Sequence, residues 1–153
     1  MGPRKGRAFS LVEAIIAALL VGIIAMIAVP RLNFAAIPKQ KADCAARKIV
    51  TDLRRTRRLA ISDAANNTQG FGLRMLGGPG YTTYEIVNLN TSVTLDSHTI
   101  DSDVSCTGGT TFDFGPLGNL KTGSGTELIV GAEGKHITIT IITATGAIQC
   151  VDN

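Results

Sequence analysis

The side chains that could carry out catalysis are few in this chain and are not arranged for it. His98 and His136 have no cysteine, serine or carboxylate motif beside them that would make a nucleophilic or metal-binding group. The segment GAEGKH has the lysine of a phosphate-binding loop, but Ile129 stands where the first glycine belongs and His136 where a serine or threonine belongs. Asp101 and Asp103 are typical turn formers. The sequence therefore predicts no catalytic residue, no metal ligand and no cofactor.

A group of arginines could instead contact phosphates, as in a nucleic-acid-binding surface. The group consists of Arg54, Arg55, Arg57 and Arg58. On a helix these four side chains cover most of the circumference rather than one stripe, and no aromatic residue lies among them. A solvated or subunit-facing helix surface is the interpretation that the sequence favours over nucleic acid.

The formal net charge of +3 is unevenly distributed along the chain. Residues 31–74 carry ten basic side chains against three acidic ones, whereas residues 75–153 carry two against eight. Opposite charges in the two halves suit packing between copies of the chain at least as well as they suit binding to a polyanion.

A glutamate lies near the start of the longest apolar run. From Ala14 to Val29 no side chain is polar, and Glu13 comes directly before that stretch. A carboxylate one turn into lipid costs on the order of 2.5–3.5 kcal/mol. Glu13 could snorkel toward the headgroups. Alternatively, it could pair with the α-amino group that a cut before Phe9 would create on another copy, and the repeated axial stagger would then build a helical filament.

The length of this run predicts a membrane-spanning helix. From Phe9 to Val29 a helix would be roughly 31 Å long, enough to cross a hydrocarbon core. Arg4, Lys5 and Arg7 precede the run and should stay in the cytoplasm. The run is too long for a secretory signal peptide, and helical character continues after it.

The continuation is amphipathic and should lengthen the same helix. Pro30 and Pro38 should bend or interrupt it, and the pair Asn66-Asn67 is a reasonable stop. We therefore expect one long helix over residues 9–66. Small and apolar side chains recur at steps of three and four and should form its buried face: Ala42, Ala45, Ala46, Ile49, Leu53, Thr56 and Ala60.

After Gly70, short runs rich in β-branched and aromatic residues alternate with turn sequences such as GGPG, DSDVSCTGG and EGK. The run HITITI alternates polar and apolar residues and should have one solvent-exposed face. The expected fold class is α+β, with one long N-terminal helix packed on a small antiparallel sheet. The expected parts are a membrane-spanning helix at 9–30, an amphipathic helix at 31–68 and a β domain at 69–153.

The cysteines leave two alternatives open. Cys106 and Cys150 both fall in the strand-rich half, so a disulfide between them and a pair of buried free thiols are equally compatible with the sequence. Cys44 should then pack as a small apolar residue.

The segment GRAFSLVEAIIAALLVGIIAMIAVP resembles the N-terminal signature of type IV pilins and pseudopilins. In that family a short basic leader ends in glycine, sometimes alanine, before a phenylalanine. Glutamate follows at the fifth mature position and proline at the twenty-second. Ala8, Phe9, Glu13, Gly22 and Pro30 fit this pattern, with Ala8 in place of the commoner glycine.

The resemblance implies a pilin fold and removal of a leader peptide, residues 1–8, by a prepilin peptidase. The enzyme would cut between Ala8 and Phe9 and methylate the new amino group of Phe9. Glu13 would neutralise that amine on an adjacent subunit during assembly. The implied partners are other pilins or pseudopilins in a helical filament, the peptidase, an inner-membrane assembly platform and the lipid bilayer. The chain would first cross the bacterial inner membrane once, with its C-terminal domain in the periplasm, and would then enter the filament.

Two further segments are similar to the GspH/FimT family of minor pseudopilins. That family has a Leu-x-x-Ala-Arg-Ser-Glu-Ala-Ile pattern at the helix end and a Phe-x-x-x-Gly turn before its last strands. The helix end matches at Leu53, Arg57, Ala60 and Ile61 and departs at Thr56, Arg58 and Leu59. In the closing segment, Phe112 or Phe114 with Gly118 fits the turn, the HITITI run fits a strand, and Gly146 fits the glycine that opens the final strand. The similarity implies a minor pseudopilin, a structural subunit of a type II secretion pseudopilus or a related type IV pilus. The alternatives are a tip-located minor pilin that binds DNA for natural transformation, and a major pilin subunit.

Overall fold

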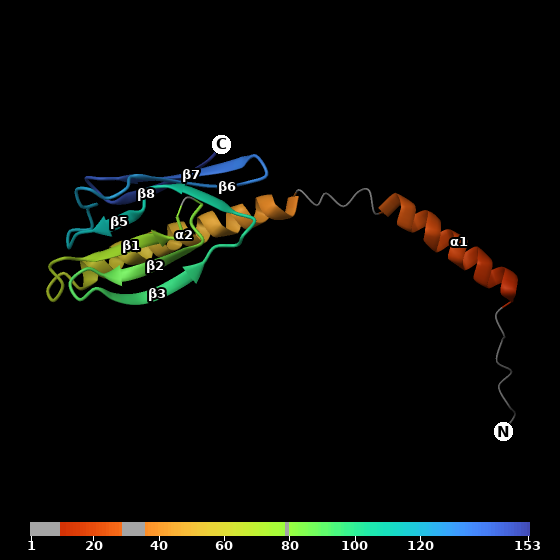
Figure 1. Cartoon of the computed structure of the whole chain (residues 1–153), viewed down its shortest axis with the longest axis horizontal. Helices are drawn as coiled ribbons and strands as arrows, with labels where there is room; N and C mark the ends of the chain where they lie inside the picture. The colour runs from red at the N-terminus through yellow and green to blue at the C-terminus, as the bar shows by residue number, and fades with distance from the viewer. Residues whose placement is uncertain (1–9, 29–35, 79) are drawn as a thin grey trace, which may run out of the picture. The chain divides into compact units, whose positions relative to one another are not determined.

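The computed structural model describes residues 10–28, 36–78 and 80–153, which fall into two compact units divided after Phe34. The first unit contains one helix, α1 (Leu11–Ala28). The second unit contains the helix α2 (Ala36–Ser62) and eight strands (Figure 1).

The prediction of one long helix over residues 9–66 is wrong, because the structure has two separate helices. α1 ends two residues before Pro30, in keeping with the rule that the residue preceding a proline disfavours the helical conformation. Pro30 itself lies outside the described residues. Pro38, which was expected to bend or interrupt the helix, lies in the first turn of α2. A proline is tolerated there because the first backbone N–H groups of a helix have no intrahelical partner.

The expectation of a single-pass inner-membrane protein is contradicted as well. Among the described residues, neither helix has the combination of length and apolar character that crossing a membrane requires.

The strands of the second unit form two antiparallel sheets of four strands each, where the sequence predicted one small sheet. The first sheet has the order β3-β2-β1-β5 and the second the order β4-β6-β7-β8. In chain order the strands are Phe71–Leu76 (β1), Thr83–Asn88 (β2), Val93–Thr99 (β3), Ser105–Gly108 (β4), Thr111–Phe114 (β5), Glu127–Ala132 (β6), Lys135–Ile142 (β7) and Ala147–Asp152 (β8). The sequence anticipated these strands except β4, whose residues were interpreted as part of a turn, and the second half of β3. The run DSHTIDSD was interpreted as a turn, but its first residues, 96–99, continue β3.

Both sheets pack against α2, which supplies the centre of the core (Figure 1). The predicted buried face of the helix is confirmed, except that Ala45 is only partly buried. β7 alternates as expected, with Ile137, Ile139 and Ile141 buried beneath α2 and the residues between them more exposed. Every residue of the main hydrophobic cluster lies between positions 42 and 148, so the second unit contains its own core.

Candidate functional site

α1 begins directly after Ser10, whose carbonyl oxygen accepts hydrogen bonds from the backbone N–H groups of Glu13 (3.0 Å) and Ala14 (3.1 Å). Glu13 stands three residues after Ser10, which is the spacing of a capping box. A carboxylate in the first turn of a helix is stabilised by the helix dipole by about 0.3–1 kcal/mol. Glu13 therefore has a local role that the sequence reasoning missed, although the Ser-x-x-Glu spacing was there to find it.

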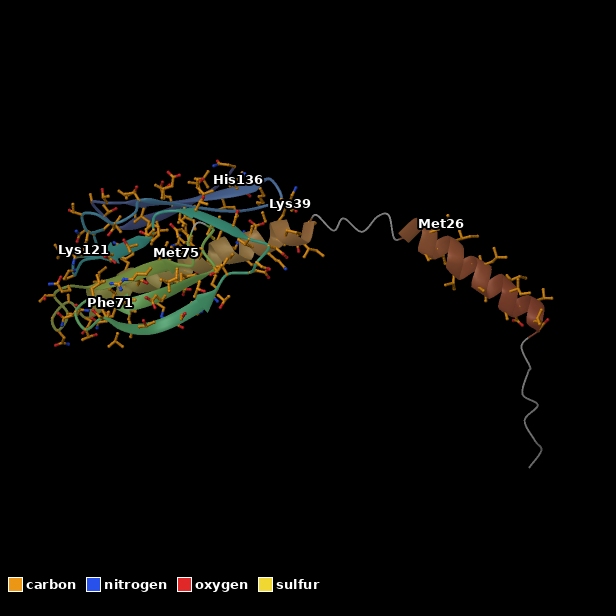
Figure 2. The ribbon with its side chains drawn as sticks, in the orientation of Figure 1. Met26, Lys39, Phe71, Met75, Lys121 and His136 are labelled. Carbon is orange, nitrogen blue, oxygen red and sulfur yellow. The ribbon has the colours of Figure 1, made fainter. Side chains whose placement is uncertain are left out.

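The side chains of α1 are exposed throughout the part of the helix where they are described, residues 11–26. The exposed fraction is 76% for Leu11, the first residue of α1, and 81% for Met26, two residues before its end. Figure 2 labels Met26 on α1. A Cβ added at Gly22 would meet nothing within 4 Å. Among the described residues of the first unit, the apolar side chains of α1 therefore have no packing partner. The space above Gly22 is open.

The residues expected to be processed cannot be placed. Ala8, Phe9 and Pro30 lie outside the described residues, so the cleavage, the methylation and the assembly role of Pro30 stay predictions. Glu13 and Gly22 lie on α1 as expected, but their roles in assembly are likewise untested.

Two of the four clustered arginines are used within the second unit. The Nη1 atom of Arg55 lies 2.7 Å from Oδ2 of Asp96 on β3, and this ion pair holds the pKa of Asp96 below its usual value. The Nε atom of Arg57 donates a 3.0 Å hydrogen bond to the carbonyl oxygen of Gly118. These two arginines therefore hold β3 and the loop at residues 115–120 against α2.

The other two arginines point elsewhere. Arg54 lines a groove beside β8, and Arg58 is exposed. The four guanidinium groups thus do not share one surface. This arrangement weakens the case for a phosphate-binding cluster, in line with the preference drawn from the sequence.

The cysteines are free thiols in the structure. Cys106 is buried on β4 and Cys150 is exposed on β8, at opposite edges of the same sheet. Three strand spacings separate those edges, roughly 14 Å, whereas a disulfide needs Cα atoms about 4.4–6.8 Å apart. The disulfide alternative is therefore wrong, and the free-thiol alternative holds except that Cys150 is not buried. Cys44 is exposed rather than packed.

A buried polar cluster was not anticipated from the sequence. The hydroxyl group of Tyr84 donates a 2.6 Å hydrogen bond to Oδ2 of Asp52, whose exposed fraction is 7%. The Nε2 atom of His98 lies 3.5 Å from the same oxygen and 3.4 Å from Oδ2 of Asp96. Burial and the hydrogen bond to Asp52 raise the pKa of Tyr84, so this hydroxyl stays protonated. The cluster links α2 to β2 and β3. It also gives the buried carboxylate of Asp52 hydrogen-bonding partners on the core side of the helix.

Two lysines tie the N-terminal half of α2 to the strands. Lys41 binds Asp101 (3.1 Å) and also Asp103, and the backbone N–H of Asp103 donates to Oδ1 of Asp101, which confirms the predicted turn. On the other side of α2, Lys135 of β7 lies 2.8 Å from Asp43 and 3.0 Å from Asp152. These hydrogen bonds raise the pKa of both lysines.

An open groove of about 500 Å³ lies between α2 and β8. Its floor contains Ala46, Val50 and Ile137, and its rim carries Arg47 and Arg54. A smaller groove of about 230 Å³ lies on the opposite side of α2, next to β2 and the end of β3. Neither groove brings together residues with catalytic chemistry.

Comparison with known proteins gives no relative: the chain matches no protein-family model, no curated protein and no solved structure.

Proposed function

We propose that this chain is a structural subunit of a filament, a minor pseudopilin of a type II secretion pseudopilus or of a related type IV pilus. The observation that carries the proposal is α1. It is a helix of 18 residues, apolar except for Glu13, and its described side chains are exposed. A surface of this kind needs a partner, and the α1 helices of neighbouring copies are the partner that we propose.

The apolar side chains of α1 could contribute enough free energy on burial to offset the cost of helix–helix association. Ten large apolar side chains of α1 are exposed, each by half or more: Leu11, Val12, Ile15, Ile16, Leu19, Leu20, Val21, Ile23, Ile24 and Met26. Burying one such side chain contributes about 1.5–3 kcal/mol. Burial of half of them would therefore contribute on the order of 10 kcal/mol, which is comparable to the cost of association, about 4–15 kcal/mol.

Glu13 is the residue that would set the register between copies. In a bundle of α1 helices its carboxylate would lose water and would need a positive partner. The amino group of Phe9, once the chain is cut after Ala8, would supply that charge from an adjacent copy. Gly22, which has free space above it, would allow a close approach of a neighbouring helix.

The proposal is tested first by intact mass spectrometry of the chain made in a bacterium with a prepilin peptidase. We expect the loss of residues 1–8 and the gain of one methyl group, and the same chain made in a strain without the peptidase serves as control. An uncut chain in both strains would contradict the proposal.

The assembly step is tested by Glu13→Gln, which removes the charge but keeps the shape of the side chain. We expect normal processing and a strong loss of filament-dependent cross-links between α1 helices. Glu133→Gln, in a turn of the second unit, is the matched control and should assemble normally. Assembly of Glu13→Gln at the level of the unchanged chain would contradict the pairing.

A further inference from the structure

β8 forms one edge of the second sheet, and its free edge carries unpaired backbone groups. The order β4-β6-β7-β8 leaves one side of β8 without a strand among the described residues. The backbone N–H of Asn153 donates a 2.9 Å hydrogen bond to the carbonyl oxygen of His136 on the side of β7. Hydrogen bonds alternate along an antiparallel pair, so the N–H and C=O groups of Ile148, Cys150 and Asp152 point to the free edge.

The side chains of the same three residues face α2. They are paired in register with Ile141, Ile139 and Ile137, whose side chains are buried on the helix side of the sheet. The groove of about 500 Å³ opens between α2 and two of these β8 residues, Cys150 and Asp152. A strand added at the free edge of β8 would therefore lie over the groove and project every second side chain into it.

The charges around the groove are not balanced. Asp43 and Asp152 share the ammonium group of Lys135 at 2.8 and 3.0 Å. Arg47 and Arg54, by contrast, have no carboxylate within 4 Å among the described residues, and both are exposed. Three cations, Lys135, Arg47 and Arg54, stand against the two carboxylates, which leaves one net positive charge. An occupant of the groove would meet the two exposed guanidinium groups beside an apolar floor.

We propose that the free edge of β8 and the adjoining groove bind an extended acidic segment of a partner protein, which adds a fifth strand to the sheet. Main-chain hydrogen bonds to β8 would supply affinity, as in other cases of strand addition. Specificity would come from the alternate side chains that face the groove, with carboxylates paired to Arg47 and Arg54. This site is independent of the filament proposed above, since it lies wholly in the second unit.

A second copy of the chain is a weaker candidate for the same edge. Pairing of β8 with β8 about a two-fold axis would place both α2 helices on the same side of the joined sheet. The arginines of the two grooves would then face one another, and such like-charge contact is unfavourable.

The test uses the full chain in mild detergent with a fluorescent eight-residue peptide of alternating valine and glutamate. We expect the matched valine–lysine peptide to bind at least about tenfold more weakly, because it places ammonium groups against Arg47 and Arg54. The double variant Arg47→Ala/Arg54→Ala should lower affinity for the glutamate peptide about tenfold, at about threefold per exposed ion pair. Lys48→Ala removes an exposed cation on the other side of α2 and should change affinity less than twofold.

Two measurements separate strand addition from simple charge attraction. Only one of the two alternating sets of peptide N–H groups would face β8. N-methylation of that set should abolish binding, whereas N-methylation of the other set should be tolerated. In a Cys44→Ala background, bound peptide should also slow alkylation of Cys150, the remaining exposed thiol.

The proposal is overturned by equal binding of the two peptides, by equal effects of both N-methylation patterns, or by no binding at millimolar peptide. It is also overturned if mild oxidation of the Cys44→Ala chain gives a dimer cross-linked through Cys150, because a second copy would then cover the edge.

Discussion

The turn between β7 and β8 provides a sharp test of how the second unit is held together. Gly146 has φ +64°, and a Cβ added there would lie 1.9 Å from the carbonyl oxygen of Gly118, where real Cβ contacts essentially never fall below 3.0 Å. That oxygen accepts the hydrogen bond from Arg57 of α2. Gly146→Ala must therefore push the loop at residues 115–120 away from the helix.

The magnitude follows from two contributions. An alanine at positive φ costs about 1–2 kcal/mol. Moving Gly118 far enough to clear the new methyl group would break its bond to Arg57, and a hydrogen bond to a charged group is worth about 1.5–3 kcal/mol. We expect Gly146→Ala to lower the free energy of unfolding by about 3–5 kcal/mol.

Gly134 is the matched control for this substitution. It has φ +77°, but a Cβ there would meet nothing within 4 Å. Gly134→Ala should therefore cost only the conformational contribution, about 1–2 kcal/mol.

The assay is urea unfolding of the full chain followed by tyrosine fluorescence, because the chain has no tryptophan and both tyrosines lie in the second unit. A difference of about 2–3 kcal/mol between the two variants would separate their midpoints by about 1–2 M urea. Equal midpoints would refute the argument that Gly118 fixes this loop against α2.

Three further predictions concern the second unit. Tyr84→Phe removes the donor of the 2.6 Å hydrogen bond to a buried carboxylate on α2, so the free energy of unfolding should fall by about 1–3 kcal/mol, measured by the same urea assay. Arg55 lowers the pKa of Asp96 in the folded chain, below the value near 3.8 of the unfolded chain. The ion pair therefore stabilises the fold above pH 3.8, and this stabilisation is lost as the pH falls through the folded-state pKa of Asp96. Arg55→Ala should therefore reduce the fall of the urea midpoint between about pH 5 and about pH 2.5. Arg58→Ala is the control and should leave that fall unchanged. Equal falls in the two variants would refute the pairing of Arg55 with Asp96. Burial raises the pKa of Cys106 to about 11. A maleimide should therefore label two thiols in the native chain and the third only after unfolding. Labelling of three thiols in the native chain would contradict the buried position of Cys106.

Local patterns predicted the elements of the second unit well. The spacing of Ile49, Leu53 and Ala60 identified the buried face of α2, because helical periodicity depends only on nearby residues. The alternation in HITITI likewise identified which side of β7 is buried. β4 was missed because its residues follow an aspartate-rich turn and include two of the polar types that also favour turns, serine and threonine.

The errors came from features that depend on the whole chain. A proline interrupts a helix or starts one according to where the helix begins, and the sequence did not show that α2 begins at Ala36. The division into two sheets could not be read from strand composition, since it is set by which strands pair. The buried cluster of Asp52, Tyr84 and His98 joins residues far apart in sequence, and no motif marked it.

The charge distribution shows how the sequence and the structure fit together. The basic first half and the acidic second half suggested packing between copies, yet much of that charge is paired within one chain. Lys41 binds Asp101 on one side of α2, and Arg55 binds Asp96 further along the helix. What remains unpaired is therefore more informative than the total. Arg47 and Arg54 stand seven residues apart, two helical turns, on the side of α2 that faces the free edge of β8. Lys48 and Arg58 are also exposed and have no ion pair among the described residues, but they do not line the groove beside β8. Arg47 and Arg54 are therefore the charges by which this groove would select a partner.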